Sequence, residues 1–224
     1  MVAMALIGLG VAAITAYASP MWQVTSVEVR GNDLLSAEQI TEKAGVLGKS
    51  ILAVDVKEVE KAITSLGPAG RVVVSRSFPD RITISVEERP GWGAWQVGQT
   101  RYLIDGEGVV LTDKAPPSLP TIRAMDGKPL QSGDRVDGGA VKLAQTLIQV
   151  LPQKMGLQAR SFEYLSYGGL VVITDAGWRA RVGDASDLDY KFAVWKAILD
   201  KKGELPIKPV HVDLRFGARP FFRQ

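Results

Sequence analysis

Cysteine is absent from the 224 residues of this chain. Its absence excludes disulfide bonds and metal sites built from thiolates. It does not identify the compartment, because a chain of this size can bury a sufficient core without covalent cross-links.

Histidine is almost absent as well, and His211 is the single example. It lies on the polar face of a predicted strand, beside Asp213 and Arg215. A surface or interface role is expected there, since a catalytic base needs a nucleophile and an orienting group next to it. The sequence also lacks G-x-S-x-G, P-loop, H-E-x-x-H and paired-cysteine patterns. We therefore predict no enzymatic activity, no catalytic, cofactor-binding or metal-binding residues, and no small-molecule substrate.

Three acidic residues stand close together at Asp184, Asp187 and Asp189. Such a cluster could suggest a calcium loop, but the glycine and terminal glutamate of an EF-hand are missing at the required spacing. Helix capping is the better interpretation. Asp187 is expected to cap a helix whose apolar positions are Leu188, Phe192, Trp195, Ile198 and Leu199.

Charge is missing from the N-terminal segment: no charged residue precedes Glu28, and Met1 to Ala18 is nearly all aliphatic. An apolar run of about 20 residues can cross the hydrocarbon layer as a helix. We predict an uncleaved single-pass membrane anchor over residues 1–20, with the N-terminus cytoplasmic. The alternative is a signal peptide, because Ala16-Tyr17-Ala18 before Ser19 resembles a cleavage site.

What is present is typical of a folded protein: 46% of the residues are hydrophobic, 23% are charged, and the formal net charge is +3. Lysine and arginine are scattered among acidic residues along the chain. This pattern is typical of an ordinary solvated surface, so no nucleic-acid partner is expected.

Residues 21–90 predict a small unit with the order β-α-α-β-β. Three strands are predicted: polar and apolar residues alternate in Val24 to Arg30 and in Arg81 to Glu88, and Arg71 to Ser77 is rich in residues that favour strands. Ser36 to Gln39 has the pattern of a capping box for the first helix, which Gly45 can end. The second helix is expected to begin after Asp55, and its apolar stripe is Val56, Val59, Ile63 and Leu66.

Residues 91–224 predict a larger unit that is richer in strands. A hairpin is expected over Tyr102 to Leu111 and a helix over Ala140 to Leu151, broken at Pro152. Gly91-Trp92-Gly93 and Gly138-Gly139 are interpreted as turns. Three further strands are expected as a meander: Phe162 to Tyr167, Leu170 to Thr174 and Trp178 to Val182.

The segment from Arg76 to Pro90, R-S-F-P-D-R-I-T-I-S-V-E-E-R-P, resembles the end of the POTRA domain in FtsQ/DivIB proteins. In that family a strand, an F-P turn, an I-x-I-x-V strand and an E-R-x-P exit recur. Other matching pieces follow one another in the family's order: V-E-V-R-G-N at Val27 to Asn32, A-V-D-V at Ala53 to Val56, Y-L-I-D-G-E-G-V-V at Tyr102 to Val110, S-L-P at Ser118 to Pro120 and V-D-L-R-F at Val212 to Phe216.

The resemblance implies an α+β protein with a transmembrane anchor over 1–20, a POTRA domain over 21–90 and a β domain over 91–224. The β domain would hold a mixed or antiparallel sheet with flanking helices and a C-terminal edge strand. The implied function is a non-enzymatic divisome scaffold that links membrane proteins of the FtsB and FtsL type and helps to recruit septal cell-wall synthesis at midcell. The POTRA domain and membrane helix would contact other division proteins.

An envelope transport or outer-membrane assembly component is the alternative, because POTRA domains serve there too. One POTRA domain without a following barrel of alternating strands of about ten residues argues against it.

The resemblance also suggests where a partner binds. The final strand, expected over about Val210 to Phe222, would be a sheet edge that accepts a strand of an FtsB-type partner. Phe216 is the expected anchor, supported by Arg215, Phe221 and Phe222. Alternatively, these phenylalanines cover the core of the domain itself. Pro220 cannot donate a backbone hydrogen bond, so strand pairing must stop before it or place it facing away.

Overall fold

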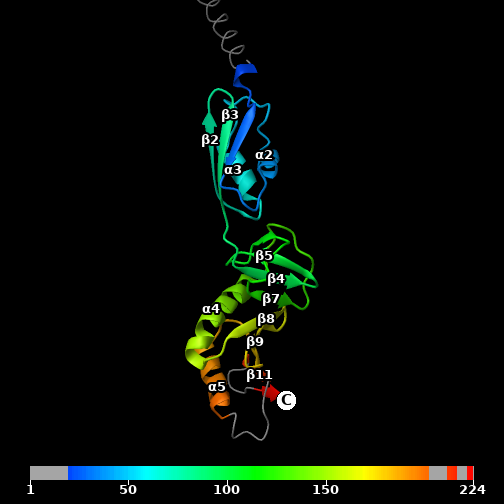
Figure 1. Ribbon diagram of the computed structural model, residues 1–224, viewed down its shortest axis with the longest axis vertical. Helices are drawn as coiled ribbons and strands as arrows, with labels where there is room; N and C mark the ends of the chain where they lie inside the picture. Colours follow the sequence, from blue (N-terminus) through cyan, green and yellow to red (C-terminus); the bar gives the residue numbers. More distant parts are fainter. Residues whose placement is uncertain (1–19, 202–210, 216–220, 224) are drawn as a thin grey trace, which may run out of the picture. The chain divides into compact units, whose positions relative to one another are not determined.

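The computed structural model describes residues 20–201, 211–215 and 221–223 (Figure 1). The chain divides into two compact units, Met1–Arg89 and Pro90–Gln224, and each is described by itself. The predicted membrane anchor, apart from Pro20, lies outside the described residues. Among the residues that are described, no helix has both the length and the apolar character needed to cross a membrane. Helices and sheets are combined in the chain, so the predicted α+β class is confirmed.

The first unit has the predicted β-α-α-β-β order, preceded by one short 3₁₀ helix. Its elements are η1 (Pro20–Trp22), β1 (Ser26–Arg30), α2 (Ala37–Ala44), α3 (Val56–Thr64), β2 (Ala69–Ser77) and β3 (Arg81–Glu88). The strands form a sheet in the order β1-β3-β2, in which β3 is parallel to β1 and antiparallel to β2. Ile40 of α2 and Ile63 of α3 are fully buried with Ile82 and Ile84 of β3, so the two helices and the sheet share one core.

Both helices begin at the residues that the sequence indicates. The Ser36 hydroxyl accepts a hydrogen bond from the Gln39 amide at 3.2 Å, and the Gln39 side chain accepts one from the Ser36 amide at 3.0 Å. Gly45 ends α2 in the left-handed conformation, with φ of 56°. Asp55 accepts hydrogen bonds from the backbone of Lys57 and Glu58. Each cap satisfies amides that no carbonyl within the helix can reach.

A carboxylate at the end of β3 closes the unit. Glu88 accepts hydrogen bonds from three consecutive backbone amides, those of Asp33, Leu34 and Leu35, at 3.0, 2.7 and 2.9 Å. These amides lie in the connection between β1 and α2, so one side chain joins this connection to the last residue of β3. Hydrogen bonds to an ionised acceptor are stronger than those between neutral groups.

We expect Glu88→Ala to lower the free energy of unfolding of the first unit by about 1–3 kcal/mol, because three amides lose a charged acceptor. Urea denaturation of the purified protein measures the change. Glu87→Ala is the matched control, since Glu87 is adjacent and exposed, and its effect should stay within about 0.5 kcal/mol. Equal losses in the two variants would contradict a specific role for Glu88.

The second unit is built on a nine-stranded sheet. Its strands are β4 (Gly93–Val97), β5 (Thr100–Ile104), β6 (Val110–Thr112), β7 (Thr121–Ala124), β8 (Ala159–Leu165), β9 (Gly169–Thr174), β10 (Arg179–Gly183), β11 (His211–Asp213) and β12 (Phe221–Arg223). The spatial order is β12-β11-β10-β9-β8-β7-β4-β5-β6. The pairs β4/β7, β7/β8 and β10/β11 are parallel and the others antiparallel, so the sheet is mixed.

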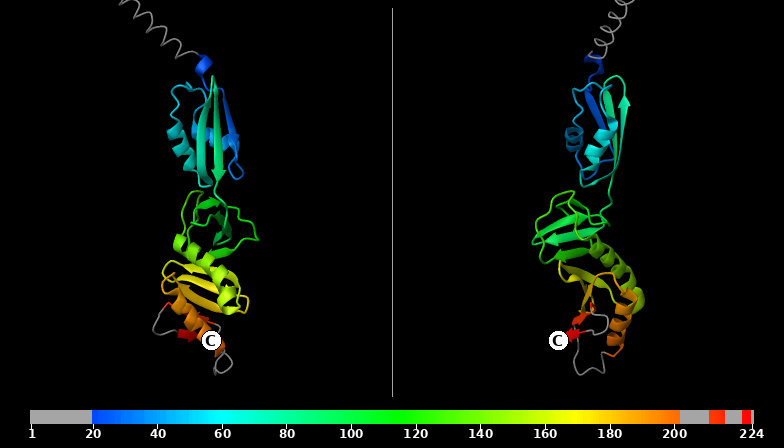
Figure 2. Two further views of the ribbon diagram at one scale, coloured as in Figure 1. Left: turned by 90° about the vertical axis from the view of Figure 1, so that its left-hand side faces the viewer. Right: turned by 180° about the vertical axis from the view of Figure 1, so that it is seen from behind.

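Two helices, α4 (Gly138–Met155) and α5 (Leu188–Asp200), lie on the same side of this sheet (Figure 2). Together with the inward side chains of the strands they form one apolar core. Trp178 and Trp195 are its largest fully buried residues, and Leu143, Leu147 and Ile122 are also fully buried. The predicted hairpin at β5 and β6 and the predicted meander of β8, β9 and β10 are confirmed.

Two predicted turns are wrong. Gly93 begins β4, and a side chain there would lie 3.0 Å from the Pro120 carbonyl, next to the amide of Ala94 that bonds to it. Gly138 begins α4, where a side chain would lie 2.8 Å from the Glu107 carbonyl. Both glycines allow close approach of two backbone segments, a role that a turn pattern does not distinguish.

The expected helix break at Pro152 is also wrong, because α4 continues through Pro152 to Met155. Proline has no amide proton to donate to the carbonyl of Ile148, so one helical hydrogen bond is missing. The buried Leu151 and Leu157 hold this end of α4 in the core. The helix ends one turn later at Gly156, which has φ of 66° and donates to the Pro152 carbonyl at 3.1 Å.

Candidate partner-binding edge

The two ends of the nine-stranded sheet are organised differently. At one end, residues of the same chain lie along the outer side of β6. The Val110 amide donates to the Asp134 carbonyl at 2.9 Å, and the Gly133 amide donates to the Val110 carbonyl at 2.8 Å. Val109 and Arg135 also form an antiparallel bridge. At the other end stands β12, which pairs with β11, and within the described ranges no strand pairs with its outer side. Among the described strands, β12 is therefore the unpaired edge of the sheet.

The predicted final strand, Val210 to Phe222, is wrong as a single element. It consists of two strands, β11 and β12, which pair antiparallel with Val212 opposite Phe222 and Asp213 opposite Phe221. β11 is an inner strand, since it also pairs parallel to β10. The alternation of polar and apolar residues is correct for β11, but a short alternating segment does not show where the chain reverses.

β11 is fixed in the sheet by its core side. Val212 and Leu214 are buried, and the Leu214 amide donates to the Arg181 carbonyl at 2.9 Å. His211, on the opposite face, is exposed as expected. Behind this strand α5 contributes Phe192 and Trp195 to the same core, so the position of the edge depends on the packing of α5.

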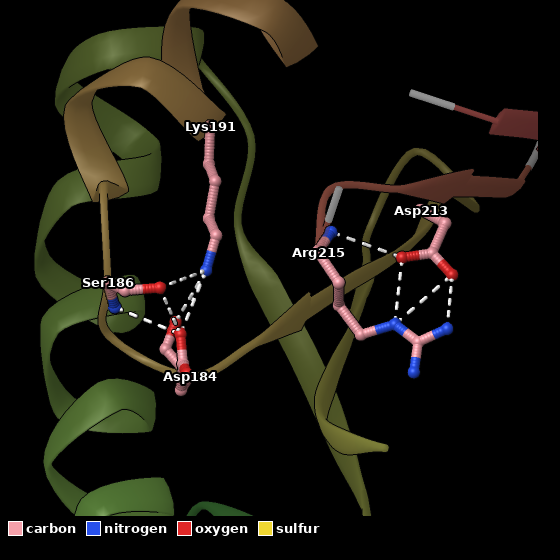
Figure 3. A network of polar contacts seen from close by, with 5 residues as sticks. All are labelled: Asp184, Ser186, Lys191, Asp213 and Arg215. Atoms are coloured by element: carbon pink, nitrogen blue, oxygen red, sulfur yellow. Dashed lines mark hydrogen bonds and ion pairs between the residues drawn. The ribbon is translucent and has the colours of Figure 1, made fainter. Parts of the chain in front are cut away.

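Arg215 folds back onto Asp213 directly after β11 (Figure 3). Its Nε lies 3.0 Å from Oδ1 and its Nη2 lies 2.8 Å from Oδ2, while its backbone amide donates to Oδ1 at 3.1 Å. Burial alone would raise the pKa of Asp213, but the hydrogen bonds from Arg215 and the positive charges of Arg215 and Arg181 outweigh it and lower this pKa. The hydrogen bond from Arg215 to Asp213 raises the arginine pKa in turn. The pair stays ionised at neutral pH.

A second polar group lies at the start of α5 (Figure 3). The side chain of Lys191 is 5% exposed, and its ammonium donates to the Asp184 carbonyl at 3.0 Å and to the Asp184 carboxylate at 3.1 Å. Ser186 donates to the same carboxylate through its hydroxyl and its amide. The hydrogen bonds from Ser186, followed by the one from Lys191, lower the pKa of Asp184 to about 2.

Lys191 was not found from the sequence, although a signal was present. It stands three residues after Leu188 and four before Trp195, on the apolar stripe of the helix. A lysine on such a stripe indicates a buried cation that needs a nearby acceptor. Asp187, which was expected to cap α5, is correctly placed at the helix start but makes no capping hydrogen bond with its side chain and has φ of 48°. The carboxylate that accepts hydrogen bonds at this end of α5 is that of Asp184, which pairs with Lys191.

The four predicted partner-binding residues are described to different extents. Arg215 is half-buried and paired with Asp213. Phe216 lies outside the described residues. Phe221 and Phe222 belong to β12 through their backbone, and their side chains lie outside what the structure describes. In the described ranges no group of three or more acidic, histidine or cysteine side chains could hold a metal ion.

Comparison with known protein families gives one match for each unit. The family described as "POTRA domain, FtsQ-type" matches residues 23–89. The family described as "Cell division protein FtsQ/DivIB, C-terminal" matches residues 93–215. The second match covers more than half of the chain and includes β11 and the Asp213–Arg215 pair.

Similar proteins named cell division protein FtsQ occur in several bacteria. The protein from Chloroflexus aurantiacus is 28% identical over 184 residues, which cover 81% of this chain and 68% of that protein. The protein from Caulobacter vibrioides strain NA1000 is 25% identical over 171 residues, covering 76% of this chain and about half (51%) of the relative. The protein from Streptomyces bingchenggensis is 28% identical over 210 residues, covering 89% and 78%. The chain belongs to the FtsQ/DivIB family of cell-division proteins.

Proposed function

We propose that this chain is a non-enzymatic scaffold of the division machinery that binds a partner protein by adding the partner's extended segment to β12. The observation that carries this proposal is the difference between the two sheet edges. The chain covers β6 with its own residues 133–135, whereas β12 ends the sheet. Backbone amides and carbonyls at such an edge supply affinity, and side chains at alternate positions supply specificity.

The proposed partners are membrane division proteins of the FtsB and FtsL type, in keeping with family membership. Arg215, Phe216, Phe221 and Phe222 are the proposed contact residues. The Asp213–Arg215 pair supports this assignment, because it fixes the backbone beside β12 while about a quarter of the arginine side chain stays accessible. A partner carboxylate could share the guanidinium, which has five donors.

Residues 1–20 are proposed to anchor the chain in the inner membrane, with a POTRA domain over 21–90 and a β domain over 91–224 outside the cytoplasm. The POTRA domain and the anchor are proposed to contact further division proteins. A role in envelope transport is less favoured, since the C-terminal unit matches a cell-division family.

Localisation in dividing cells tests this proposal. A fluorescent protein fused to the N-terminus should give septal bands, and the fusion should remain in the membrane fraction after alkaline extraction, because an inserted apolar helix cannot leave the bilayer without exposing its side chains to water. A uniform envelope signal would contradict the division role. An unfused chain recovered in the soluble fraction with Ser19 as its first residue would support the signal-peptide alternative.

A further inference from the structure

One end of the first unit exposes large apolar side chains. Met21, Leu47, Leu52 and Phe78 are 59%, 54%, 42% and 59% exposed. These residues belong to three segments that are separate in the sequence: η1, the connection between α2 and α3, and the turn between β2 and β3. We call these four residues the apolar tip.

Hydrogen bonds and a ring contact bring the three segments together. The Ile51 amide donates to the Trp22 carbonyl at 2.7 Å, and the Val24 amide donates to Lys49 at 2.9 Å. These bonds join the segment from η1 to β1 to the α2–α3 connection. The rings of Trp22 and Phe78 meet edge to face with centroids 6.3 Å apart. This contact joins η1 to the β2–β3 turn. In Figure 1, η1 and the arrowhead of β2 lie at the same end of the unit.

Exposed apolar side chains are concentrated at this end. Among the described residues of the first unit there are two others of this kind, Leu34 and Val73. Leu34 follows β1 and donates to Glu88 at the far end of β3, and Val73 lies within β2, opposite Ser85. Isolated apolar residues on a surface are ordinary, but a group of them at one end indicates an interaction surface.

The sequence indicates what covers the tip. Residues 1–19, which precede η1 in the sequence, contain no charged side chain. An apolar segment of that length is suited to lipid, and the tip follows it after one or two residues. Tryptophan is enriched at the membrane–water boundary, and exposed leucine and phenylalanine can enter the acyl region there. Lys49, the one charged residue from Gly45 to Leu52, is exposed and suits an anionic lipid surface.

We propose that the apolar tip rests in the outer boundary of the lipid bilayer, so that the POTRA unit contacts the membrane through Met21, Leu47, Leu52 and Phe78 in addition to its chain connection. This inference rests on the proposed membrane anchor. The contact would restrict the unit to one orientation against the membrane, with β1, β2 and β3 each having one end at the lipid surface.

The lack of cysteine makes a direct test simple. Four single-cysteine variants of the full chain, Leu47→Cys, Phe78→Cys, Leu34→Cys and Val73→Cys, are labelled with an environment-sensitive fluorophore and placed in nanodiscs of phosphatidylethanolamine and phosphatidylglycerol. Nitroxide-labelled lipid should quench the probes at 47 and 78 several-fold more than those at 34 and 73. Aqueous iodide should show the opposite order. All four positions are exposed in the protein, so the labels do not disturb a core.

Alkaline extraction of the same samples separates this inference from the anchor. If the chain is retained but the probes at 47 and 78 are as accessible to iodide as the controls, lipid contact is overturned and the anchor stands. If the chain leaves the membrane, both proposals fail. A Leu47→Glu/Phe78→Glu variant provides a further check: a third probe at Leu52→Cys should lose its lipid quenching in that background, and unchanged quenching would contradict insertion of the tip.

Discussion

Phe222→Pro is expected to weaken partner binding about tenfold or more relative to Phe222→Ala, because proline removes an outward-facing backbone donor that alanine keeps. The pairing of β11 determines the direction in which the Phe222 amide points. The Leu214 amide points to β10, where it donates to Arg181, so the amide of Asp213 points to β12 by alternation along the strand. Phe221, opposite Asp213, therefore points back to β11, and the Phe222 amide points outward.

Phe221→Pro is the matched comparison, because it removes the inward donor of the neighbouring residue. Its expected effect is a lower thermal midpoint of the second unit, since the β11–β12 pairing is broken. Phe222→Ala separates the amide from the side chain: it keeps the N–H and should bind better than Phe222→Pro. Titration with a synthetic extracytoplasmic segment of an FtsB-type protein measures binding, and calorimetry measures the midpoint. Full-strength binding by Phe222→Pro would contradict strand addition at this edge.

Trp195→Ala is expected to lower the free energy of unfolding of the second unit by about 3–5 kcal/mol. The indole is fully buried in the core that joins α5 to the sheet, so removing it leaves a cavity in this core. A loss of this size is a large share of the roughly 5–15 kcal/mol that a domain has in total. Partner binding should fall with it, because β12 pairs with a strand that this core holds in place.

Two variants control for this prediction. Tyr190 lies on the same helix, but half of its side chain is exposed. Tyr190→Ala should therefore change the free energy of unfolding by no more than about 0.5 kcal/mol. Trp195→Phe should cost clearly less than Trp195→Ala, since the ring keeps most of the volume and the buried indole N–H has no hydrogen-bond partner to lose. Urea denaturation measures all three. Similar losses for Trp195→Ala and Tyr190→Ala would show that α5 does not hold the edge.

Local signals in the sequence were sufficient for the first unit. Ser36, Asp55 and Gly45 act within a few residues of their position, so both helix starts and the end of α2 could be predicted from the caps alone. The predicted stripe of the second helix was too long, because α3 ends at Thr64 and Leu66 lies beyond it. The strict alternation of Arg81–Glu88 gave the bounds of β3 correctly. The hydrogen bonds between Glu88 and the amides after β1 could not be predicted, because they join residues more than fifty positions apart.

Distant contacts explain the errors in the second unit. Gly93 and Gly138 looked like turn residues, but each allows close contact with a carbonyl elsewhere in the chain. The final strand was expected to be one edge element, whereas β11 became an inner strand by parallel pairing with β10 across α5. Periodicity shows which side of a strand faces the core, and it carries no information about which strands become neighbours.

The candidate site was predicted only in part, because it too depends on contacts between residues that are distant in the sequence. The resemblance indicated Arg215, but its fixed conformation depends on Asp213, Leu214 and the carbonyl of Arg181 together. Phe216 remains a prediction, as it lies outside the described residues. The Lys191–Asp184 pair was missed because the acidic cluster was interpreted without its buried cation.

The closed edge at β6 has a consequence for stoichiometry. A sheet with two free edges can add strands at both ends, and copies of such a sheet can join into open chains that grow without limit. Here residues 133–135 already occupy one side of β6, so within the described part of the sheet the proposed strand addition is left with one edge, at β12. If partners bind by the proposed strand addition, each chain recruits a single partner segment through this sheet, and pairing of two copies at β12 would give a closed pair instead of a filament.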